Sequence, residues 1–333
     1  MKLGLDIMGG DFAPQNAIDG VILALPELGN DDTLVLIGRE SVIKEELSKR
    51  GVSVSDTSGV SDTSGTSDTS GGRISIINAD EVIDMEEKPI KALKEKPNSS
   101  ISIGFQMLSA GKIDSFASAG NSGAMLAGAV SIVKCIPGVS RPCIGTVLPT
   151  ENGNYAMLLD IGTTPDAKPD VLVQFAILGS IYMEIFGKKN PSVCLLNVGT
   201  EDGKGNQQTQ ATFPLMQQSE HINFVGNREP RDFFKGEADV FVADGFVGNI
   251  VLKELETFYR LLQKRGISDP FFNTFNYELY GGTPLLGINA PVVLGHGISS
   301  ALAFKNMILQ MKNVHNNGIV QKLRTIFEQY NNA

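Results

Sequence analysis

Along most of this chain, a short apolar or alternating run is followed by a loop of small polar residues and then by a longer apolar or amphipathic stretch. A period of two predicts a strand, and apolar residues spaced by three or four predict a helix. The six segments with this strand, loop and helix order are 2–25, 114–134, 154–187, 192–218, 239–265 and 290–312. Four further runs are typical of strands, at 33–38, 73–78, 142–148 and 222–226.

Strands that alternate with helices of this length predict an α/β fold with a largely parallel sheet covered on both faces. Right-handed crossovers bring the strand-to-helix loops to the carboxyl edge of such a sheet, where open α/β sheets bind ligands. We therefore expect one catalytic domain over residues 1–333, with its functional residues in these loops.

One segment interrupts the alternation of predicted strands and helices with a short repeat. Between residues 55 and 71, the motif Ser-Asp-Thr-Ser-Gly occurs three times at a spacing of six residues. It contains no large apolar group that a core would bury. The segment is therefore predicted to be a flexible surface insertion that contributes little to stability or catalysis.

A second unusual segment is 251–280. Val251, Leu255, Phe258 and Leu262 fall on one face of a predicted helix, and the sequence FFNTFNYELY follows. One interpretation is a core helix and a loop that fills a gap with aromatic rings. The other is a dimer or membrane-contact surface whose interface includes Phe258 and Leu262. In that case the basic residues Lys253, Arg260 and Lys264 would flank the contact.

The composition excludes several classes of protein. The chain has 333 residues with 42% hydrophobic and 20% charged residues, and its formal net charge of −9 argues against nucleic-acid binding. No apolar run approaches the length of a membrane span, and Asp6 comes too early for a secretory signal. The three cysteines lack CxxC spacing. We therefore expect a cytoplasmic protein without a disulfide framework or zinc site.

The loop Gly120–Gly123 has the composition of an anion cradle. It lies between a predicted strand and a predicted helix, and a helix N-terminus offers unpaired N–H groups and partial positive charge. Glycine lets the backbone approach a phosphate closely. The alternative interpretation is a tight turn in which Asn121 or Ser122 caps the helix.

The common nucleotide and hydrolase signatures are absent. No predicted strand leads into GxGxxG, and GTEDGKG has the wrong glycine spacing for a phosphate-binding P-loop. GxSxG and HExxH do not occur, and the three histidines are dispersed. The sequence therefore predicts neither a serine nucleophile nor a metal site.

Polar residues at the loop ends are the remaining candidates. Lys168 precedes Pro169, which is favoured at the first helical position, and would add its charge to the helix dipole. His296 lies between two glycines after an apolar strand and is placed to donate to an anion or oxyanion. The full set is Asp6, Asp11, Asn121, Ser122, Lys168, Asn197, Asp202, Lys204, Asp244, Asn249 and His296. These residues predict an α/β enzyme that binds phosphate or a phosphorylated compound.

At these loops the chain resembles the bacterial phosphate acyltransferases of phospholipid synthesis. The matching blocks run in order over nearly the whole chain and include LDIMGGDFAP, SAGNSGAMLAGA, RPCIGTVLPT, LLDIGTTPDAKPDVLVQFAILGSIY, LLNVGTEDGKGN, INFVGN, ADVFVADGFVGNIVLK and APVVLGHGISS. The resemblance implies that fatty acyl-acyl carrier protein and orthophosphate react to give acyl phosphate and free carrier protein. The acyl phosphate then feeds a membrane glycerol-3-phosphate acyltransferase.

The resemblance also implies a fold and an assembly. It implies a three-layer α/β/α sandwich with a mostly parallel sheet, as in isopropylmalate dehydrogenases and phosphotransacetylases, a homodimer, and no cofactor. Two features depart from the family. The Ser-Asp-Thr-Ser-Gly repeat is foreign to it, and segment 251–280 is shorter than the helical hairpin that links relatives to dimer contact and peripheral membrane association.

Phosphate is its own nucleophile in this reaction, so the protein must bind it and stabilise the oxyanion. We expect Gly120, Asn121, Ser122, Gly123 and Lys168 at the phosphate, with Asp6, Asp244 and Asn249 nearby, and His296 or Asn197 at the carbonyl oxygen. Three alternatives remain open. They are a phosphotransacetylase-like enzyme that uses an acyl-coenzyme A, a metal- and NAD-dependent dehydrogenase, and a non-catalytic scaffold that brings the carrier protein to the membrane enzyme.

Overall fold

The computed structural model describes residues 1–54 and 72–332. The Ser-Asp-Thr-Ser-Gly repeat, and the prediction made for it, lie outside the described residues. The chain divides into two compact units. Unit 1 comprises Met1–Lys134, Tyr277–Gly282 and Ala290–Asn316, and unit 2 comprises Cys135–Asn276, Thr283–Asn289 and Asn317–Ala333. The pattern of strands and helices predicts one domain over 1–333 and does not separate these units.

Unit 1 contains a sheet of parallel strands in the order β3-β2-β1-β4-β11. Their bounds are β1 (Lys2–Asp6), β2 (Thr33–Gly38), β3 (Ile74–Asn78), β4 (Ser115–Ser118) and β11 (Val292–Leu294). The central strand β1 pairs with β2 and β4, with Leu3 opposite both Leu34 and Ser115. The loops after β1, β4 and β11 therefore leave the same edge of this sheet.

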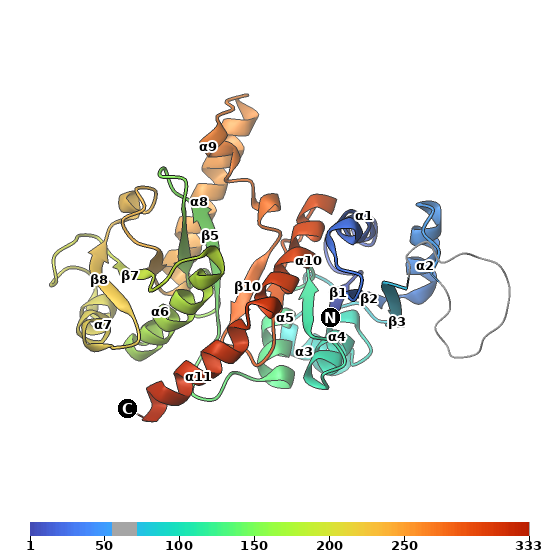
Figure 1. The fold of residues 1–333 in the computed structure, drawn as a ribbon, viewed down its shortest axis with the longest axis horizontal. Helices are drawn as coiled ribbons and strands as arrows, with labels where there is room; N and C mark the ends of the chain where they lie inside the picture. The colour runs from blue at the N-terminus through green and yellow to red at the C-terminus, as the bar shows by residue number, and fades with distance from the viewer. Residues whose placement is uncertain (55–71, 333) are drawn as a thin grey trace. The chain divides into compact units, whose positions relative to one another are not determined.

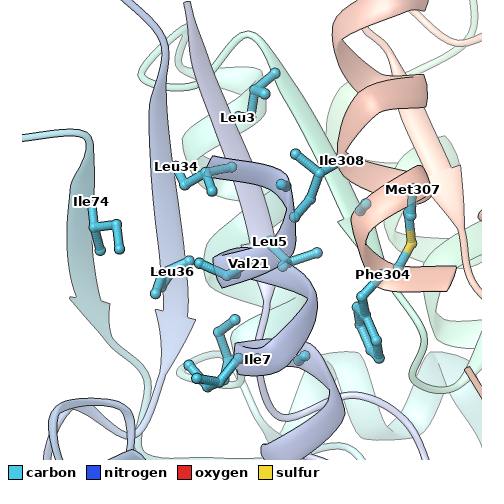
Figure 2. Close-up of a cluster of buried hydrophobic side chains, with 14 of the residues drawn as sticks. Leu3, Leu5, Ile7, Val21, Leu34, Leu36, Ile74, Phe304, Met307 and Ile308 are labelled. Carbon is cyan, nitrogen blue, oxygen red and sulfur yellow. The ribbon is translucent and has the colours of Figure 1, made fainter. Parts of the chain in front are cut away.

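The helices of unit 1 cover both faces of its sheet. They are α1 (Gln15–Ala24), α2 (Glu40–Lys49), α3 (Pro89–Glu95), α4 (Ser100–Ser109), α5 (Ser122–Gly128) and α10 (Ala301–Asn316). On β1, Leu3 and Leu5 lie in a buried cluster with Val21 of α1 and Phe304 of α10 (Figure 2). The intervening Gly4 faces the other way, where a Cβ would lie 2.4 Å from Ile113. The period of two in β1 thus produces two buried faces.

Unit 2 contains strands in the order β10-β5-β6-β9-β7-β8. Strands β10, β5, β7 and β8 are labelled in Figure 1. Their bounds are β5 (Cys143–Pro149), β6 (Tyr155–Leu159), β7 (Ser192–Leu196), β8 (Asn223–Arg228), β9 (Val240–Val242) and β10 (Thr283–Leu286). Neighbouring strands in the row β6-β9-β7-β8 pair in parallel, whereas β5 is antiparallel to both of its neighbours, β6 and β10. The loops after β6, β7 and β9 share one edge.

Helices α6 and α8 lie on opposite faces of the sheet of unit 2. A Cβ on Gly179 of α6 would lie 2.9 Å from the side chain of Leu159. The preceding residue, Leu158, packs in a cluster that includes Leu252 of α8. The helices of this unit are α6 (Pro169–Met183), α7 (Gln207–Gln218), α8 (Gly245–Lys264), the short α9 (Pro270–Asn273) and α11 (Ile319–Asn332). The predicted mostly parallel α/β architecture is confirmed.

One helix passes the length and hydropathy test for a membrane span. Pro169–Phe186 has a mean hydropathy of 1.3 over 18 residues, so the expectation that no run reaches this length is wrong for it. In the structure, 72% of this window is buried, as for the core helix of unit 2. Short helices complete the described chain: η1 (Leu25–Glu27), the π-helix η2 (Ala129–Val133), η3 (Glu184–Phe186), η4 (Pro230–Asp232) and η5 (Tyr277–Leu279).

Candidate active site

In unit 1, the buried carboxyl group of Asp6 holds together the loops that follow β1 and β4. The backbone N–H of Met8 donates to Asp6 Oδ1 at 2.9 Å, and the Ser118 hydroxyl donates to Asp6 Oδ2 at 2.6 Å. The N–H of Gly120 in turn donates to Ser118 Oγ at 2.9 Å. Burial raises the pKa of Asp6, and these hydrogen bonds offset part of the shift. Asp6 therefore shapes the two loops around it.

The loops that follow β1 and β4 approach each other closely at Gly9 and Gly120. A Cβ on Gly9 would lie 2.6 Å from the backbone nitrogen of Gly120 and 2.7 Å from Asp6 Oδ2. Real Cβ atoms do not make contacts this short, so Gly9 is required for the approach. A side chain on Gly120 would meet Ser118 Oγ at 3.1 Å and Gly9 Cα at 3.4 Å.

Asn121 caps helix α5 and also clamps a neighbouring segment. Its Oδ1 accepts from the N–H of Ala124 at 2.9 Å, while its Nδ2 is within 3.0–3.1 Å of the carbonyl oxygens of Asp84, Met85 and Glu87. The helix-cap interpretation is thus confirmed for Asn121, and its side chain is fully engaged. What remains for an anion is the backbone of the next two residues.

The backbone N–H groups of Ser122 and Gly123 begin helix α5. In the part of the chain that the structure describes, neither group has a hydrogen-bond acceptor. A Cβ on Gly123 would lie 2.4 Å from Pro89 Cγ, so glycine lets α3 pack against this turn. The anion cradle stays a prediction, now reduced to two backbone donors at a fixed helix start.

Gly120→Val is expected to raise the phosphate KM by about tenfold or more, because its side chain would push the Gly9 and Gly120 loops apart. Steady-state kinetics at varied phosphate concentration would measure this change. Thermal unfolding of the same variant shows how much of the effect is lost stability. An unchanged KM in a folded variant would place the anion away from this loop.

His296 leaves the same edge of unit 1 as Asp6 and Gly120, because β11 pairs with β4. Its ring centroid lies 5.6 Å from that of Tyr277, and its carbonyl oxygen accepts from the N–H of Ser299 at 2.9 Å. Asp11 is tied to this loop through its N–H, which donates to the carbonyl oxygen of Gly297 at 2.7 Å. The structure therefore brings the predicted unit 1 residues to one edge.

In unit 2, Asp160 shapes the loop after β6, and the residue patterns above did not identify it. Its side chain is completely buried. Oδ2 accepts from the Thr163 hydroxyl at 2.7 Å and from the Thr164 N–H at 2.7 Å, and Oδ1 accepts from the Ile144 N–H at 3.2 Å. The N–H groups of Gly162 and Thr163 also point to this carboxylate. Burial raises the pKa of Asp160 despite these bonds.

A signal for Asp160 was present in the sequence. The block GLDIMGG around Asp6 is matched by LLDIGTT around Asp160. In both places an aspartate ends a buried strand and is followed by isoleucine and a glycine-containing loop. In both, a neighbouring parallel strand leads to a helix that packs on the aspartate loop. The two units thus repeat one arrangement.

Helix α8 begins against the Asp160 loop. Its N-cap residue Asp244 accepts from the N–H of Val247 at 2.8 Å, and the Gly245 N–H donates to the carbonyl oxygen of Thr164 at 2.9 Å. A Cβ on Gly248 would lie 1.9 Å from the carbonyl oxygen of Asp160, so only glycine fits there. Asp244 therefore acts as a helix cap.

Asn249 and Lys168 are predicted site residues that lie exposed near this edge. A Cβ on Gly162 would lie 3.9 Å from Asn249 Oδ1, which places this amide beside the Asp160 loop. Lys168 is the N-cap residue of α6, whose first residue is Pro169 as predicted. No carboxylate among residues 1–54 and 72–332 forms an ion pair with the Lys168 ammonium group.

The first turn of α6 provides backbone donors beside Lys168. No side chain caps this 15-residue helix, and the N–H groups of Asp170 and Val171 have no acceptor within the described chain. Within the described chain, an unpaired cation and open N–H groups at the start of a long helix suit a phosphate dianion, and the role of Lys168 stays a prediction. The Asp170 carboxylate weakens the attraction but leaves these donors in place.

Asn197 braces the loop after β7. Its Nδ2 donates to the Lys204 carbonyl oxygen and to Asn227 Oδ1, each at 3.1 Å, and its Oδ1 accepts from the Val198 N–H at 2.9 Å. Both amide hydrogens are therefore engaged, which favours a structural role. The prediction that Asn197 contacts a carbonyl oxygen stays untested. Lys204 lies 3.8 Å from Glu201, and Asp202 is exposed on the same loop.

The described residues contain no group of three or more His, Cys, Asp or Glu that is placed to hold a metal ion. Burial raises the pKa of Cys143 and Cys194 well above the usual thiol value. Both thiols therefore stay protonated at neutral pH and are poor nucleophiles.

Comparisons with known proteins identify the family of the chain. A family described as "Fatty acid synthesis protein" matches residues 1–267. The phosphate acyltransferase of Dictyoglomus thermophilum is 39% identical, with 92% of each chain covered. The phosphate acyltransferase of Lactiplantibacillus plantarum is 40% identical, and the match covers 98% of this chain and 94% of that one.

The fold also matches a solved phosphotransacetylase. The crystal structure from Streptococcus pyogenes superposes with a TM-score of 0.61 over 94% of each chain, at 20% sequence identity. This likeness supports the predicted fold class. The near full-length sequence matches go further and confirm the resemblance stated for the loop motifs: the chain belongs to the family of phosphate acyltransferases, enzymes that carry out acyl transfer with phosphate.

Proposed function

We propose that this enzyme transfers a fatty acyl group from acyl carrier protein to orthophosphate. A phosphate oxygen attacks the thioester carbonyl carbon, the new C–O bond forms, and the C–S bond breaks. The carrier thiolate leaves and takes a proton from solvent. The acyl phosphate is the substrate that we assign to a membrane glycerol-3-phosphate acyltransferase, on the way to phosphatidic acid.

The observation that carries this proposal is Lys168 at the uncapped start of α6. An ammonium group with no carboxylate partner among the described residues, next to two N–H groups that are open there, suits a doubly charged anion that must be held in place. Positioning a nucleophile against a bound carbonyl can supply roughly 7–11 kcal/mol of the barrier in favourable cases. The chain therefore needs no nucleophile of its own.

The donor to the developing oxyanion is assigned to His296. Its loop follows β11 and lies against the Asp11 loop of unit 1. One well-placed donor to an oxyanion is typically worth about 3–4 kcal/mol. His296→Ala should therefore affect kcat more than the phosphate KM, whereas a change at Lys168 should affect phosphate binding.

The test of the acyl donor compares acyl-carrier protein with acyl-coenzyme A carrying the same chain. We expect phosphate-dependent release of thiol to be faster with the carrier protein at equal concentration. Faster turnover with coenzyme A would favour the phosphotransacetylase-like alternative. Binding of carrier protein without any phosphate-dependent thiol release would favour the scaffold.

We further propose a cytoplasmic homodimer with peripheral contact at the inner face of the membrane. The support is the outer face of α8, where Phe246, Ile250, Phe258 and Leu261 are 61%, 53%, 52% and 47% exposed. Leu262, predicted to share an interface with Phe258, lines a cavity together with it. The outer face of α8 is therefore the better candidate for contact.

Two of the three basic residues near this face form ion pairs, so they are less available to bind an anionic partner. Glu256 lies 2.9 Å from Lys253 and 3.1 Å from Arg260, and it belongs to the same helix. Exposed pairs of this kind contribute little to stability, but they reduce the local positive charge.

Changing Lys253, Arg260 and Lys264 together to glutamate is expected to raise the carrier-protein KM a few-fold and to weaken binding to anionic liposomes. Each basic residue near an anionic membrane contributes about 1 kcal/mol, less where Glu256 already pairs with it. The phosphate KM should stay near its original value. The matched control reverses Lys91, Lys94 and Lys112 of unit 1. Equal effects from both variants, or no effect at low salt, would remove the α8 surface from the contact.

A further inference from the structure

Unit 2 contains a cavity of about 320 Å³ beside the C-terminal half of α8. It is called the aromatic cavity here. Its lining residues are Glu151, Phe234, Leu255, Phe258, Tyr259, Leu262, Phe271, Phe272 and Phe275. All of them except Glu151 present aromatic rings or aliphatic groups, so the cavity is suited to an apolar occupant.

The walls of the aromatic cavity are held by specific contacts. Asp269 caps the short helix α9 by accepting from the N–H groups of Phe271 and Phe272 at 2.8 and 3.3 Å. The rings of Phe271 and Phe275 pack edge to face at 5.3 Å, and the ring of Phe275 lies 5.4 Å from that of Phe234. This packing keeps the aromatic side chains in place around an open volume.

The lining and volume restrict the chemistry of the occupant. A polar ligand would leave its hydrogen-bonding groups unpaired among the rings, and an anion would also meet the negative charge of Glu151. Taking about 30 Å³ for a water-sized group, the volume holds about ten carbons of a hydrocarbon chain. The end of a linear aliphatic chain meets both requirements.

Helix α8 joins the aromatic cavity to the Asp160 loop. The helix begins after Asp244, and a rise of about 1.5 Å per residue places Leu255 about 16 Å and Leu262 about 27 Å further along its axis. Val247, Ile250 and Phe258 are exposed along the way. Between Ile250 and Phe258, the half-buried side chains of Val251 and Leu255 continue the apolar stripe to the cavity.

The length of the path matches a long acyl chain. With C–C bonds of about 1.5 Å, an extended chain advances about 1.2–1.3 Å per carbon. Sixteen carbons therefore span about 20 Å from the start of α8 and end in the cavity between Leu255 and Leu262, whereas eight carbons span about 10 Å and stop short of Leu255.

We propose that the aromatic cavity binds the methyl end of the fatty acyl chain of the thioester substrate. This inference rests on the proposed function for the identity of the chain, and it adds the site that recognises chain length. Long chains gain the contacts of the cavity, and short chains do not reach them.

The test fills the cavity and compares two chain lengths. Leu262→Phe adds bulk inside the cavity, and Leu215→Phe makes the same change at an exposed leucine of α7 in the same unit. With Leu262→Phe, kcat/KM for a hexadecanoyl thioester should fall about tenfold or more, as expected when a pocket rejects a few carbons. The value for an octanoyl thioester should stay within about twofold, and Leu215→Phe should change neither.

A binding measurement separates this inference from the proposed function. The probe is a fluorescent polyene fatty acyl methyl ester, whose emission rises in apolar surroundings. Binding to the unchanged protein that is lost in Leu262→Phe and kept in Leu215→Phe supports the cavity site, whether or not acyl phosphate forms. Phe272→Ala should weaken probe binding by removing one wall.

Three outcomes would overturn the inference. One is equal loss of octanoyl and hexadecanoyl turnover in Leu262→Phe, which indicates a structural role. Another is probe binding that none of the cavity variants changes. The last is a shift in oligomeric state for Leu262→Phe alone with unchanged chain preference, because a second copy of the chain would then cover the cavity.

Discussion

Asp160→Asn is expected to lower the free energy of unfolding by about 3–5 kcal/mol, because it leaves buried N–H groups without acceptors. The buried carboxylate accepts hydrogen bonds from Ile144, Thr163 and Thr164, and an asparagine would turn an NH2 group toward some of these donors. Denaturant unfolding followed by far-UV circular dichroism would measure the loss.

The same change should reduce kcat/KM by about 100-fold, since the Asp160 loop supports the start of α8 and small displacements of binding groups are costly. Asp166→Asn is the matched control, because Asp166 belongs to the same loop and is exposed. A variant at Asp160 that keeps both stability and activity would show that the carboxylate is dispensable for the loop.

Lys168→Ala is expected to lower kcat/KM for phosphate by about one to two orders of magnitude. A hydrogen bond to a charged group contributes roughly 1.5–3 kcal/mol, and the loss should appear mainly in the phosphate KM. Because Lys168 is exposed and has no carboxylate partner in the described chain, the variant should unfold at the same temperature as the unchanged protein. Initial rates over a range of phosphate concentrations measure the effect.

Two further variants test whether the positive charge of Lys168 accounts for the loss of activity in Lys168→Ala. Lys168→Arg keeps the charge and should recover part of the loss, and Lys189→Ala removes another exposed lysine of unit 2 and should have no effect. Carrier-protein binding that persists in Lys168→Ala while turnover falls would argue against the scaffold alternative. An unchanged phosphate KM in Lys168→Ala would move the anion site elsewhere.

Much of the fold was predictable because its strands and helices carry local patterns. The run 33–38 predicts a strand that the structure has at Thr33–Gly38, and the run 192–197 contains β7. Strand β10 was missed because it is four residues long, contains Pro284 and pairs with β5 far away in the sequence. Pairing between strands that are distant in the sequence produces no local periodicity of apolar residues.

The candidate site was predictable in outline only. Loop composition indicated Asp6, Gly120 and Lys168 correctly as residues of the carboxyl edges, because strand order and helix starts follow from the pattern. It did not indicate that Asn121 and Asn197 are engaged by backbone and side-chain partners, since those contacts depend on tertiary packing. Asp160 was missed although LLDIG repeats the pattern around Asp6, because its burial and its four donor residues appear only after folding.

In the helix of segment 251–280, the sequence pattern predicted the burial of some side chains and not of others. Val251 and Leu255 pack against the core of unit 2 as their spacing predicts. Phe258 is nevertheless 52% exposed, and Leu262 lines the aromatic cavity. Periodicity predicted the buried stripe, but the cavity arises from α9 and Phe234, which the helix sequence does not contain.

The most direct test of the account is mass spectrometry of the product formed from purified protein, hexadecanoyl-acyl carrier protein and phosphate labelled with ¹⁸O at every oxygen. Attack by phosphate on the thioester carbonyl predicts hexadecanoyl phosphate that keeps all of the label, and this product should fall with Lys168→Ala. Free hexadecanoic acid without acyl phosphate, or no phosphate-dependent product at all, would contradict the account.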